Sequence, residues 1–259
     1  MTGTTFTFLG TGTSQGVPML ACECVVCRSE DPRDRRTRSS VYVEGPEGAF
    51  VIDTGADFRS QCLREGVKRV DAVVYTHAHA DHVMGFDDLR PFCRPGEMLP
   101  VYASAPTMAD LQVTFRFAFN GENRYPTYIH PDPRIIEGSF HLGGLELVPV
   151  PLPHGRVTVF GYVLRRGGEA LVAYLSDCKE VPESVTPLLA GVRHLVVDAL
   201  RHRPHPTHMS VEEALAVVAR VRPQQAWFTH ICHELGHAET EAALPPGVRI
   251  AYDGLKLEL

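Results

Sequence analysis

The sequence predicts a mixed α/β fold in a single domain that spans residues 1–259. Apolar runs rich in β-forming residues recur along the whole chain and alternate with polar or glycine-rich turns. Segments of helical periodicity lie between some of these runs, and no low-complexity tract or Pro/Ser-rich linker marks a domain boundary. The 259 residues are 44% hydrophobic and 22% charged, which is typical of a folded domain with a sizeable core.

Strands are expected where a short apolar run is bounded by turn residues. From the N-terminus these runs are 6–9, 41–43, 50–52, 72–75, 145–150, 160–164, 171–175, 194–197 and 226–228. The stretch 120–133 is rich in polar residues, tyrosine and proline, and we expect a loop there that faces substrate or a second subunit.

Three segments are expected to be helical: 105–119, 182–189 and 210–221. The last carries a defined start signal, because Ser210 can cap the N-terminus while Glu213, three residues later, completes a capping box. Its apolar residues then fall on one face of the helix.

Charge and cysteine content exclude several classes of protein. The net charge of −6 argues against a stable nucleic-acid partner or binding to acidic membranes. No run approaches the roughly 18 apolar residues of a membrane span, and the first residues lack the features of a secretory signal. The seven cysteines are an odd number, and three of them crowd into residues 22–27, a spacing that suits a metal better than disulfides. We therefore expect a cytoplasmic protein without a membrane partner.

Four residues of metal-ligating type crowd the end of a predicted buried strand. After the apolar run 72–75, the chain places three histidines and one aspartate within residues 77–82. In an extended chain His77 and His79 face one way, while Asp81 and His82, past a small-residue turn, face a second point. Imidazole and carboxylate together suit zinc, manganese or iron, so this segment predicts a metal site.

The pattern His-x-His-x-Asp-His after an apolar strand resembles the signature of the metallo-β-lactamase superfamily. Other landmarks of that superfamily occur in the expected order, each after an apolar strand: Asp53, His154, Asp177 and His230. The resemblance covers the chain from about residue 5 to the C-terminus. It implies an αββα four-layer sandwich with metals at one edge, between the two sheets.

The resemblance also implies two divalent ions at the active site, manganese or zinc first and iron or nickel as alternatives. Seven side chains would share the ligation: His77, His79 and His154 on one ion, Asp81, His82 and His230 on the other, and Asp177 between them. Asp53 is expected to orient the first histidine loop rather than to bind metal.

A second cluster, Cys22-x-Cys24-x-x-Cys27, follows a glycine-rich segment near the N-terminus. Together with a histidine three residues past the last superfamily landmark, it is similar to the phosphoribosyl 1,2-cyclic phosphate phosphodiesterase family. In that family three cysteines and a histidine hold a separate structural zinc. The resemblance implies a closed Cys3His zinc site here, completed by His233. Cys232 and His237 are the alternatives for the fourth ligand.

One histidine outside the ligand set is expected to act in catalysis. The segment 201–209 resembles, by position, the place where related phosphodiesterases keep such a residue, and His208 matches better than His205. It would donate a proton to the leaving oxygen or stabilise charge on the phosphoryl group. His208 and Asp81, the latter as a metal ligand, are the predicted catalytic residues. Arg201 and Arg203 are either phosphate-binding or part of a solvated loop.

These features favour a dinuclear metal-dependent phosphodiesterase that hydrolyses a small cyclic phosphate or phosphodiester by attack of a metal-bound hydroxide. The resemblance also implies a homodimer. One alternative is a tRNA 3′-end endonuclease, although no basic insertion that would grip tRNA is present. Others are a lactone or thioester hydrolase and a non-hydrolytic carrier resembling the pyrroloquinoline-quinone biosynthesis protein, which also has a Cys-x-Cys-x-x-Cys segment.

Overall fold

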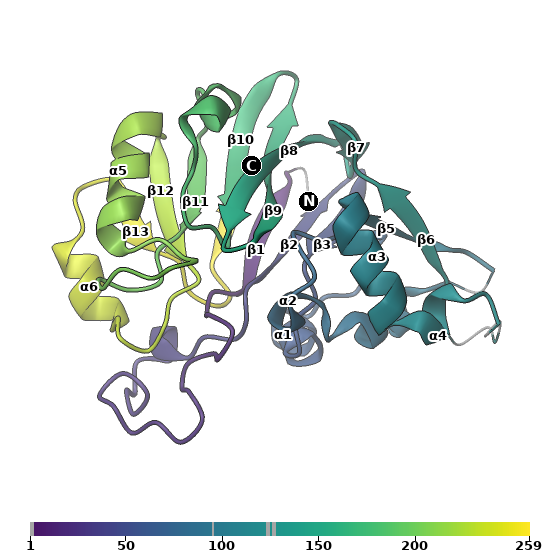
Figure 1. Ribbon diagram of the computed structural model, residues 1–259, viewed down its shortest axis with the longest axis horizontal. Coiled ribbons are helices and arrows are strands. Elements are labelled where there is room, and N and C mark those ends of the chain that lie inside the picture. Colours follow the sequence, from purple (N-terminus) through teal and green to yellow (C-terminus); the bar gives the residue numbers. More distant parts are fainter. Residues whose placement is uncertain (1–2, 95, 123–124, 126–127) are drawn as a thin grey trace.

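Two seven-stranded sheets face each other in the computed structural model, which describes residues 3–94, 96–122, 125 and 128–259 (Figure 1). Helices pack against the outer face of each sheet, so the layers are helix, sheet, sheet and helix. This arrangement confirms the αββα sandwich that the sequence predicts. Within these ranges, no helix has the length and apolar character needed to cross a membrane.

The first sheet is built from the N-terminal half of the chain and the last strand. In spatial order its strands are β14 (Lys256–Glu258), β1 (Thr5–Gly10), β2 (Ser40–Gly45), β3 (Gly48–Ile52), β4 (Ala72–Val74), β5 (Leu99–Ala103) and β6 (Pro131–Ile135). The pairs from β14 to β3 are antiparallel and those from β3 to β6 are parallel.

The second sheet repeats this plan with the C-terminal half. Its strands, in spatial order, are β13 (Val248–Ile250), β12 (Gln225–Thr229), β11 (His194–Asp198), β10 (Glu169–Leu175), β9 (Val157–Arg166), β8 (Leu145–His154) and β7 (Phe140–Leu142). Here β13 to β10 are parallel, and β10 to β7 are antiparallel. In both sheets the parallel strands direct their carboxyl ends to one edge, which is where sites form in α/β sheets.

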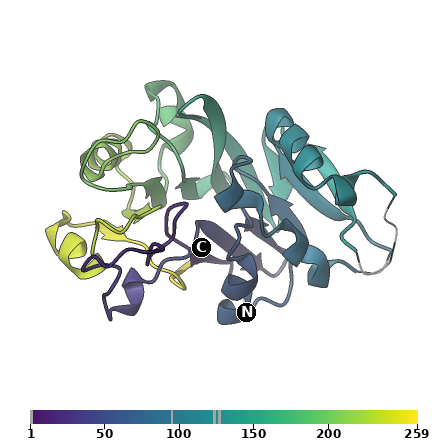
Figure 2. The same cartoon turned by 60° about the horizontal axis from the view of Figure 1, so that its bottom comes forward.

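The helices cover the two outer faces. Those against the first sheet are α1 (Phe58–Glu65), α2 (Ala80–Val83), η2 (Phe86–Phe92), α3 (Ala105–Thr114) and α4 (Arg116–Phe119). Those against the second are η3 (Glu183–Leu189) and α5 (Val211–Val221), while η1 (Pro32–Asp34) and α6 (His237–Ala243) lie where the N-terminal loop meets the C-terminal segment (Figure 2).

Large side chains fill the space between the two sheets. Phe6 and Phe8 from β1, and Tyr162 and Tyr174 from β9 and β10, are fully buried there. Burying a side chain of this size stabilises a fold by about 1.5–3 kcal/mol, so this layer holds the sandwich together.

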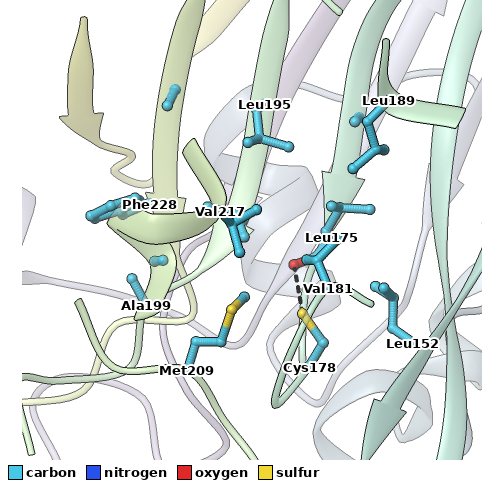
Figure 3. Close-up of a cluster of buried hydrophobic side chains, with 14 of the residues drawn as sticks. Leu152, Leu175, Cys178, Val181, Leu189, Leu195, Ala199, Met209, Val217 and Phe228 are labelled. Carbon is cyan, nitrogen blue, oxygen red and sulfur yellow. Dashed lines mark hydrogen bonds between the residues drawn. The ribbon is translucent and has the colours of Figure 1, made fainter. Parts of the chain in front are cut away.

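A second cluster lies between the second sheet and its covering helices (Figure 3). At one end of the view in Figure 3 lie Cys178, Ala199 and Met209, all fully or almost fully buried. In the chain they directly follow Asp177, Asp198 and His208, respectively, and these three residues belong to the candidate site. The packing of this cluster therefore fixes the backbone from which those site residues project.

Most predicted strands and helices are present, with changes in length. The helix expected over 105–119 is two helices, because Phe115 leaves helical geometry (φ −110°, ψ 40°) and stacks on Phe86 at 4.7 Å. The helix expected over 182–189 is the 3₁₀ helix Glu183–Leu189, and α5 begins at the predicted capping box on Ser210. The predicted loop 120–133 was wrong at its end, which lies in β6; residues 123–124 and 126–127 of it lie outside the described ranges.

Candidate metal centre

The site residues sit at or just beyond the carboxyl ends of strands in both sheets. Asp53 follows β3, His154 ends β8, Asp177 follows β10 with one residue between, and His230 follows β12. Three of them, Asp53, Asp177 and His230, have positive φ angles of 64°, 57° and 60°. Residues other than glycine rarely adopt this conformation, and it concentrates at functional sites, where the surrounding structure holds it in place.

Asp53 orients the first histidine loop through Thr76. The Thr76 amide donates to Asp53 Oδ1 and its hydroxyl donates to Oδ2, both at 2.8 Å. Because that hydroxyl proton is committed to Asp53, the Thr76 oxygen accepts from Nδ1–H of His77 at 2.9 Å. Nε2 of His77 is then unprotonated and presents a lone pair, and it is buried with no hydrogen-bond partner among the described residues. Burial also lowers the pKa of His77 well below its usual value, which keeps the imidazole in its ligand form.

His82 lies between two buried carboxylates in the second half of the site. Its Nδ1 lies 2.7 Å from Asp53 Oδ2, while its Nε2 lies 3.0 Å from Asp177 Oδ2. Burial acts to lower the pKa of His82, but the carboxylates of Asp177 and Asp53 raise it well above its usual value. Nε2 must therefore share a proton or a metal ion with Asp177, since a lone pair facing a buried carboxylate would be repulsive.

The structure brings all seven predicted ligands together in two adjacent groups. Their candidate ligand atoms lie within 4.8 Å of one another inside each group: His77, His79 and His154 form one, and Asp81, His82, Asp177 and His230 form the other. Asp177 lies between them, with Oδ1 3.0 Å from His230 Nε2 and Oδ2 3.9 Å from His77 Nε2. Imidazole nitrogens and carboxylate oxygens at this spacing fit divalent metal ions.

The two groups open into one cavity of about 370 Å³. Its wall includes His79, Asp81, His154, Asp177 and His230 from the predicted ligand set. The remaining lining residues are Ser14, Gly155, Arg156, Val157, Thr207 and His208. Among the described residues, His208 therefore lines this cavity and His205 does not.

His208 is held by a carboxylate that sequence reasoning missed. Its Nδ1 lies 2.7 Å from Oδ2 of Asp198, the last residue of β11, which is completely buried. The His208 ring stacks on His230 with 4.6 Å between ring centroids and stands 4.8 Å from His154. Asp198 could have been predicted from the sequence, because it is an acidic residue at the end of an apolar strand, as Asp53 and Asp177 are.

The cations near His208 are engaged in ion pairs. Arg201 and Arg203 both contact Glu234, at 3.1 and 2.6 Å, so the solvated-loop alternative describes them better than phosphate binding. Lys179 pairs with Glu213 at 2.6 Å and also donates to the carbonyl oxygen of His208 at 3.4 Å.

The cysteine cluster forms a separate site with His233. The Sγ atoms of Cys22 and Cys24 lie 3.2 and 3.4 Å from Nδ1 of His233, and the ligand atom of Cys27 completes a group within 4.8 Å. The hydrogen bond from the Cys27 amide lowers the pKa of Cys24 to about 6, which favours the thiolate that zinc binds. Four such donors fit a structural zinc.

Neither alternative fourth ligand belongs to this group. Cys232 Sγ accepts from the Glu234 amide at 3.4 Å, and His237 Nδ1 lies 3.1 Å from a guanidinium nitrogen of Arg36. The N-terminal loop that carries the cysteines is tied to the metal-ligating groups, because the amide of Ile231, the residue after His230, donates to the carbonyl oxygen of Thr11 at 2.9 Å.

Comparison with known proteins agrees with this geometry. A family model for the beta-lactamase superfamily domain matches residues 49–231. The structure is similar to a solved diphosphatase of the PhnP family, with 41% sequence identity and a TM-score of 0.91 over 99% of this chain and 97% of that one. Zn(2+)-bound PqqB of Methylobacterium extorquens shares the fold, with 20% identity and a TM-score of 0.81 over 98% of this chain and all of that one.

The chain belongs to the beta-lactamase superfamily and is a metal-dependent hydrolase. The PhnP-family diphosphatase and this chain match along almost the whole length of both. It is also 36% identical to an octanoyltransferase of Porphyromonas gingivalis over 258 residues. That match covers 96% of this chain but only 50% of the relative, so the chain spans about half the length of that protein.

Proposed function

We propose that this chain is a dinuclear metal-dependent phosphodiesterase acting on a small phosphodiester or cyclic phosphate. The observation that carries the proposal is that His208, held by the buried Asp198, lines the same cavity as members of both groups of metal-ligating side chains. Two ligand groups and a separate proton donor are the parts that cleavage of a phosphoester bond requires.

The residues divide between holding ions and handling protons. His77, His79 and His154 would hold one ion, and Asp81, His82 and His230 the other, with Asp177 between them. When bound, the two ions supply an activated water and neutralise charge on the phosphoryl oxygens. The Thr207 carbonyl accepts from Nδ1–H of His154 at 2.9 Å, so that Nε2 of His154 is the ligating nitrogen.

His208 is the proton donor in this proposal. The Asp198 carboxylate can only accept a hydrogen bond, so Nδ1 of His208 carries the proton in their 2.7 Å contact. Nε2 of His208 is then the nitrogen that can contact the substrate. A proton given from Nε2 to the departing alkoxide would make that oxygen a better leaving group. Asp198 stabilises the protonated imidazole before that transfer.

The size of the cavity supports a small substrate. A volume of about 370 Å³ lies at the lower end of the range for small-molecule sites. The similar solved structure is named a diphosphatase, and hydrolysis of a diphosphate is also attack of water on phosphorus, which supports a phosphoryl group as the reacting centre. Octanoyl transfer is not proposed, because half of the relative that bears that name has no counterpart in these 259 residues.

The test is hydrolysis of bis(p-nitrophenyl) phosphate by protein reconstituted with manganese or zinc, beside the monoester p-nitrophenyl phosphate. We expect the diester to be turned over in clear preference to the monoester. On 2′,3′-cyclic AMP, whose leaving group is an alkoxide, His208→Ala should lower kcat by about 10²–10⁴-fold, the usual contribution of a general acid. The loss on the p-nitrophenyl diester should be smaller, because p-nitrophenolate leaves readily without a proton. His205→Ala is the matched control, because His205 is a neighbouring histidine that does not line the cavity, and it should retain most of the activity.

Two results would contradict the proposal. One is a fully metallated protein that leaves the diester intact, which would favour lactones, thioesters or ligand binding without turnover. The other is equal loss of activity in the two histidine variants, which would remove the specific role of His208.

A further inference from the structure

Three buried polar atoms next to the metal-ligating groups have no hydrogen-bond partner among the described residues. They are Nδ1 of His230, Oδ1 of Asp198 and Oγ1 of Thr229, and the three residues are fully or almost fully buried. Buried donors and acceptors in folded proteins are nearly always paired with protein groups or with ordered water, because an unpaired group loses its hydration without compensation. These atoms therefore call for a partner.

The three residues lie together at the carboxyl ends of two neighbouring strands. Asp198 ends β11 and Thr229 ends β12, and the two are partners in the parallel register. Phe228 packs in the cluster between the second sheet and its helices (Figure 3), so Thr229 and its partner Asp198 point to the inner face of the sheet. His230 follows Thr229 directly. One candidate ligand atom from each of Asp198, His208 and His230 lies within 4.8 Å of the other two.

The surrounding contacts fix which of these atoms donate and which accept. Nε2 of His230 lies 3.0 Å from Asp177 Oδ1, so Nε2 is the nitrogen that would hold an ion, and Nδ1 carries the proton. Oδ2 of Asp198 accepts from His208 and from the Cys178 amide, whereas Oδ1 accepts from neither. The group thus offers one N–H donor, one carboxylate acceptor and one hydroxyl that can do either.

His230 differs in this respect from the other buried histidines of the ligand set. Nδ1 of His77, His82 and His154 lies 2.9, 2.7 and 2.9 Å from a hydroxyl, a carboxylate and a backbone carbonyl, respectively. A histidine that binds metal ordinarily gives its other N–H to such a group or to water, and this bond fixes the tautomer and the orientation of the ring. Within the described residues, Nδ1 of His230 has no protein group in that role.

We propose that Thr229 and Asp198 bind a buried water molecule that accepts the Nδ1–H of His230 and thereby positions this histidine for its metal ion. Buried waters typically make about three hydrogen bonds, and three partners are present here. The water accepts from His230 and from the Thr229 hydroxyl, and it donates to Oδ1 of Asp198. Thr229 is therefore a positioning residue of the metal centre. The inference goes beyond the proposed function, because it does not depend on the substrate.

The test is zinc binding by Thr229→Val, which replaces the hydroxyl with a methyl group of nearly the same size. Chelator-buffered solutions set the free zinc concentration, and the zinc-to-protein ratio is measured at each. For the wild type we expect two ions at the catalytic groups and one at the cysteines. In Thr229→Val one ion should need about tenfold more free zinc, the lower end of the usual effect of losing such an outer partner, while the others bind as in the wild type.

Three further measurements serve as controls. Thr229→Ser keeps the hydroxyl and should bind zinc as the wild type does. Thr186→Val removes another buried hydroxyl without a described partner, in η3 and outside the site, and should also leave zinc binding unchanged. A crystal structure of the zinc-loaded protein should show a water within hydrogen-bond distance of His230 Nδ1, Asp198 Oδ1 and Thr229 Oγ1.

Several results would overturn the inference. One is wild-type zinc affinity in Thr229→Val, and another is an equal loss in Thr229→Ser or Thr186→Val, since either would separate the affinity from the Thr229 hydroxyl. A direct contact between His230 Nδ1 and a protein acceptor in the zinc-loaded crystal structure would be a third. The proposed function is tested separately: a protein that binds zinc as expected but cleaves no diester would refute that function and leave the role of Thr229 in place.

Discussion

Nδ1 of His208 lies 2.7 Å from Oδ2 of Asp198, although the two residues come from different elements. Asp198 ends β11, and His208 lies in the loop that leads to α5. The same carboxylate oxygen accepts from the Cys178 amide at 3.1 Å, next to Asp177 in the chain. One buried carboxylate thus links the candidate proton donor to the backbone that carries the ligand between the two metal groups.

Asp198→Asn should lower kcat on 2′,3′-cyclic AMP, whose leaving group is an alkoxide, by about tenfold or more with little change in KM. An amide can accept the Nδ1–H bond but does not stabilise a protonated imidazole, so His208 would lose part of its contribution as a general acid. Steady-state kinetics beside the metal content of the purified protein measures this. Asp87→Asn, at an exposed position in η2, serves as the matched control. Wild-type kcat in Asp198→Asn would show that the pair has no role in turnover.

Cys24→Ser should remove one zinc per chain and lower the stability of the protein. A site that is filled at a zinc concentration 100 times its Kd contributes about 2.7 kcal/mol to folding, and loss of one of four ligands forfeits much of this. The measurements are the zinc-to-protein ratio and the free energy of unfolding in urea. Cys93→Ser changes a cysteine outside the cluster, whose Sγ donates to Leu89 instead, and should keep both values. An unchanged zinc ratio in Cys24→Ser would refute the site.

The sequence was sufficient for the elements that have strong local signals. The buried runs of β1 to β4 and β8 to β12 stand out because they are apolar and bounded by turns, and α5 because of its capping box. The strands β5, β6, β7, β13 and β14 were missed since they are short and several are partly polar, and their pairing partners are supplied by the fold. Helix α1 was missed because it carries only a weak apolar face.

The same difference between local and long-range signals decided which residues of the candidate site could be predicted. His77, His79, Asp81 and His82 are close in sequence, so their clustering is local, whereas His154, Asp177 and His230 were placed only by the order of motifs along the chain. The Asp198–His208 contact and the pairing of Arg201 and Arg203 with Glu234 depend on loops that meet in space. Periodicity and propensity carry no information on such contacts, which explains why Asp198 was missed.

Ser210→Ala should lower the free energy of unfolding by about 1 kcal/mol. Ser210 Oγ accepts from the Glu213 amide at 3.2 Å, and Glu213 Oε2 accepts from the Ser210 amide at 2.7 Å, so both donors at the start of α5 are satisfied. For a chain of this size the loss corresponds to about 2–4 °C in Tm. Glu213→Gln keeps an acceptor for the Ser210 amide and loses only the pair with Lys179, so it should cost about 0.5 kcal/mol or less. A larger loss in Glu213→Gln than in Ser210→Ala would contradict this account of the cap.

His237 should make the protein less stable as the pH falls from about 6.5 to about 4. Burial, followed by the charges of Arg36 and Arg33, lowers the pKa of His237 to about 4, although Glu241 and Asp31 act to raise it. Its Nδ1 lies 3.1 Å from an Arg36 guanidinium nitrogen, which can only donate, so Nδ1 must be unprotonated in the folded protein.

The sign follows from the two states of the chain. The unfolded chain binds a proton at His237 near pH 6.5, whereas the folded protein resists it down to about pH 4. The difference corresponds to roughly 3 kcal/mol, lost progressively over this interval and constant below it. His237→Asn keeps an acceptor near the position of Nδ1 but does not titrate, so its stability should fall less. Urea unfolding of both proteins at several pH values gives the difference directly, because all other titrating groups are common to the two. Equal losses would show that His237 is protonated as readily in the folded protein as in the unfolded chain.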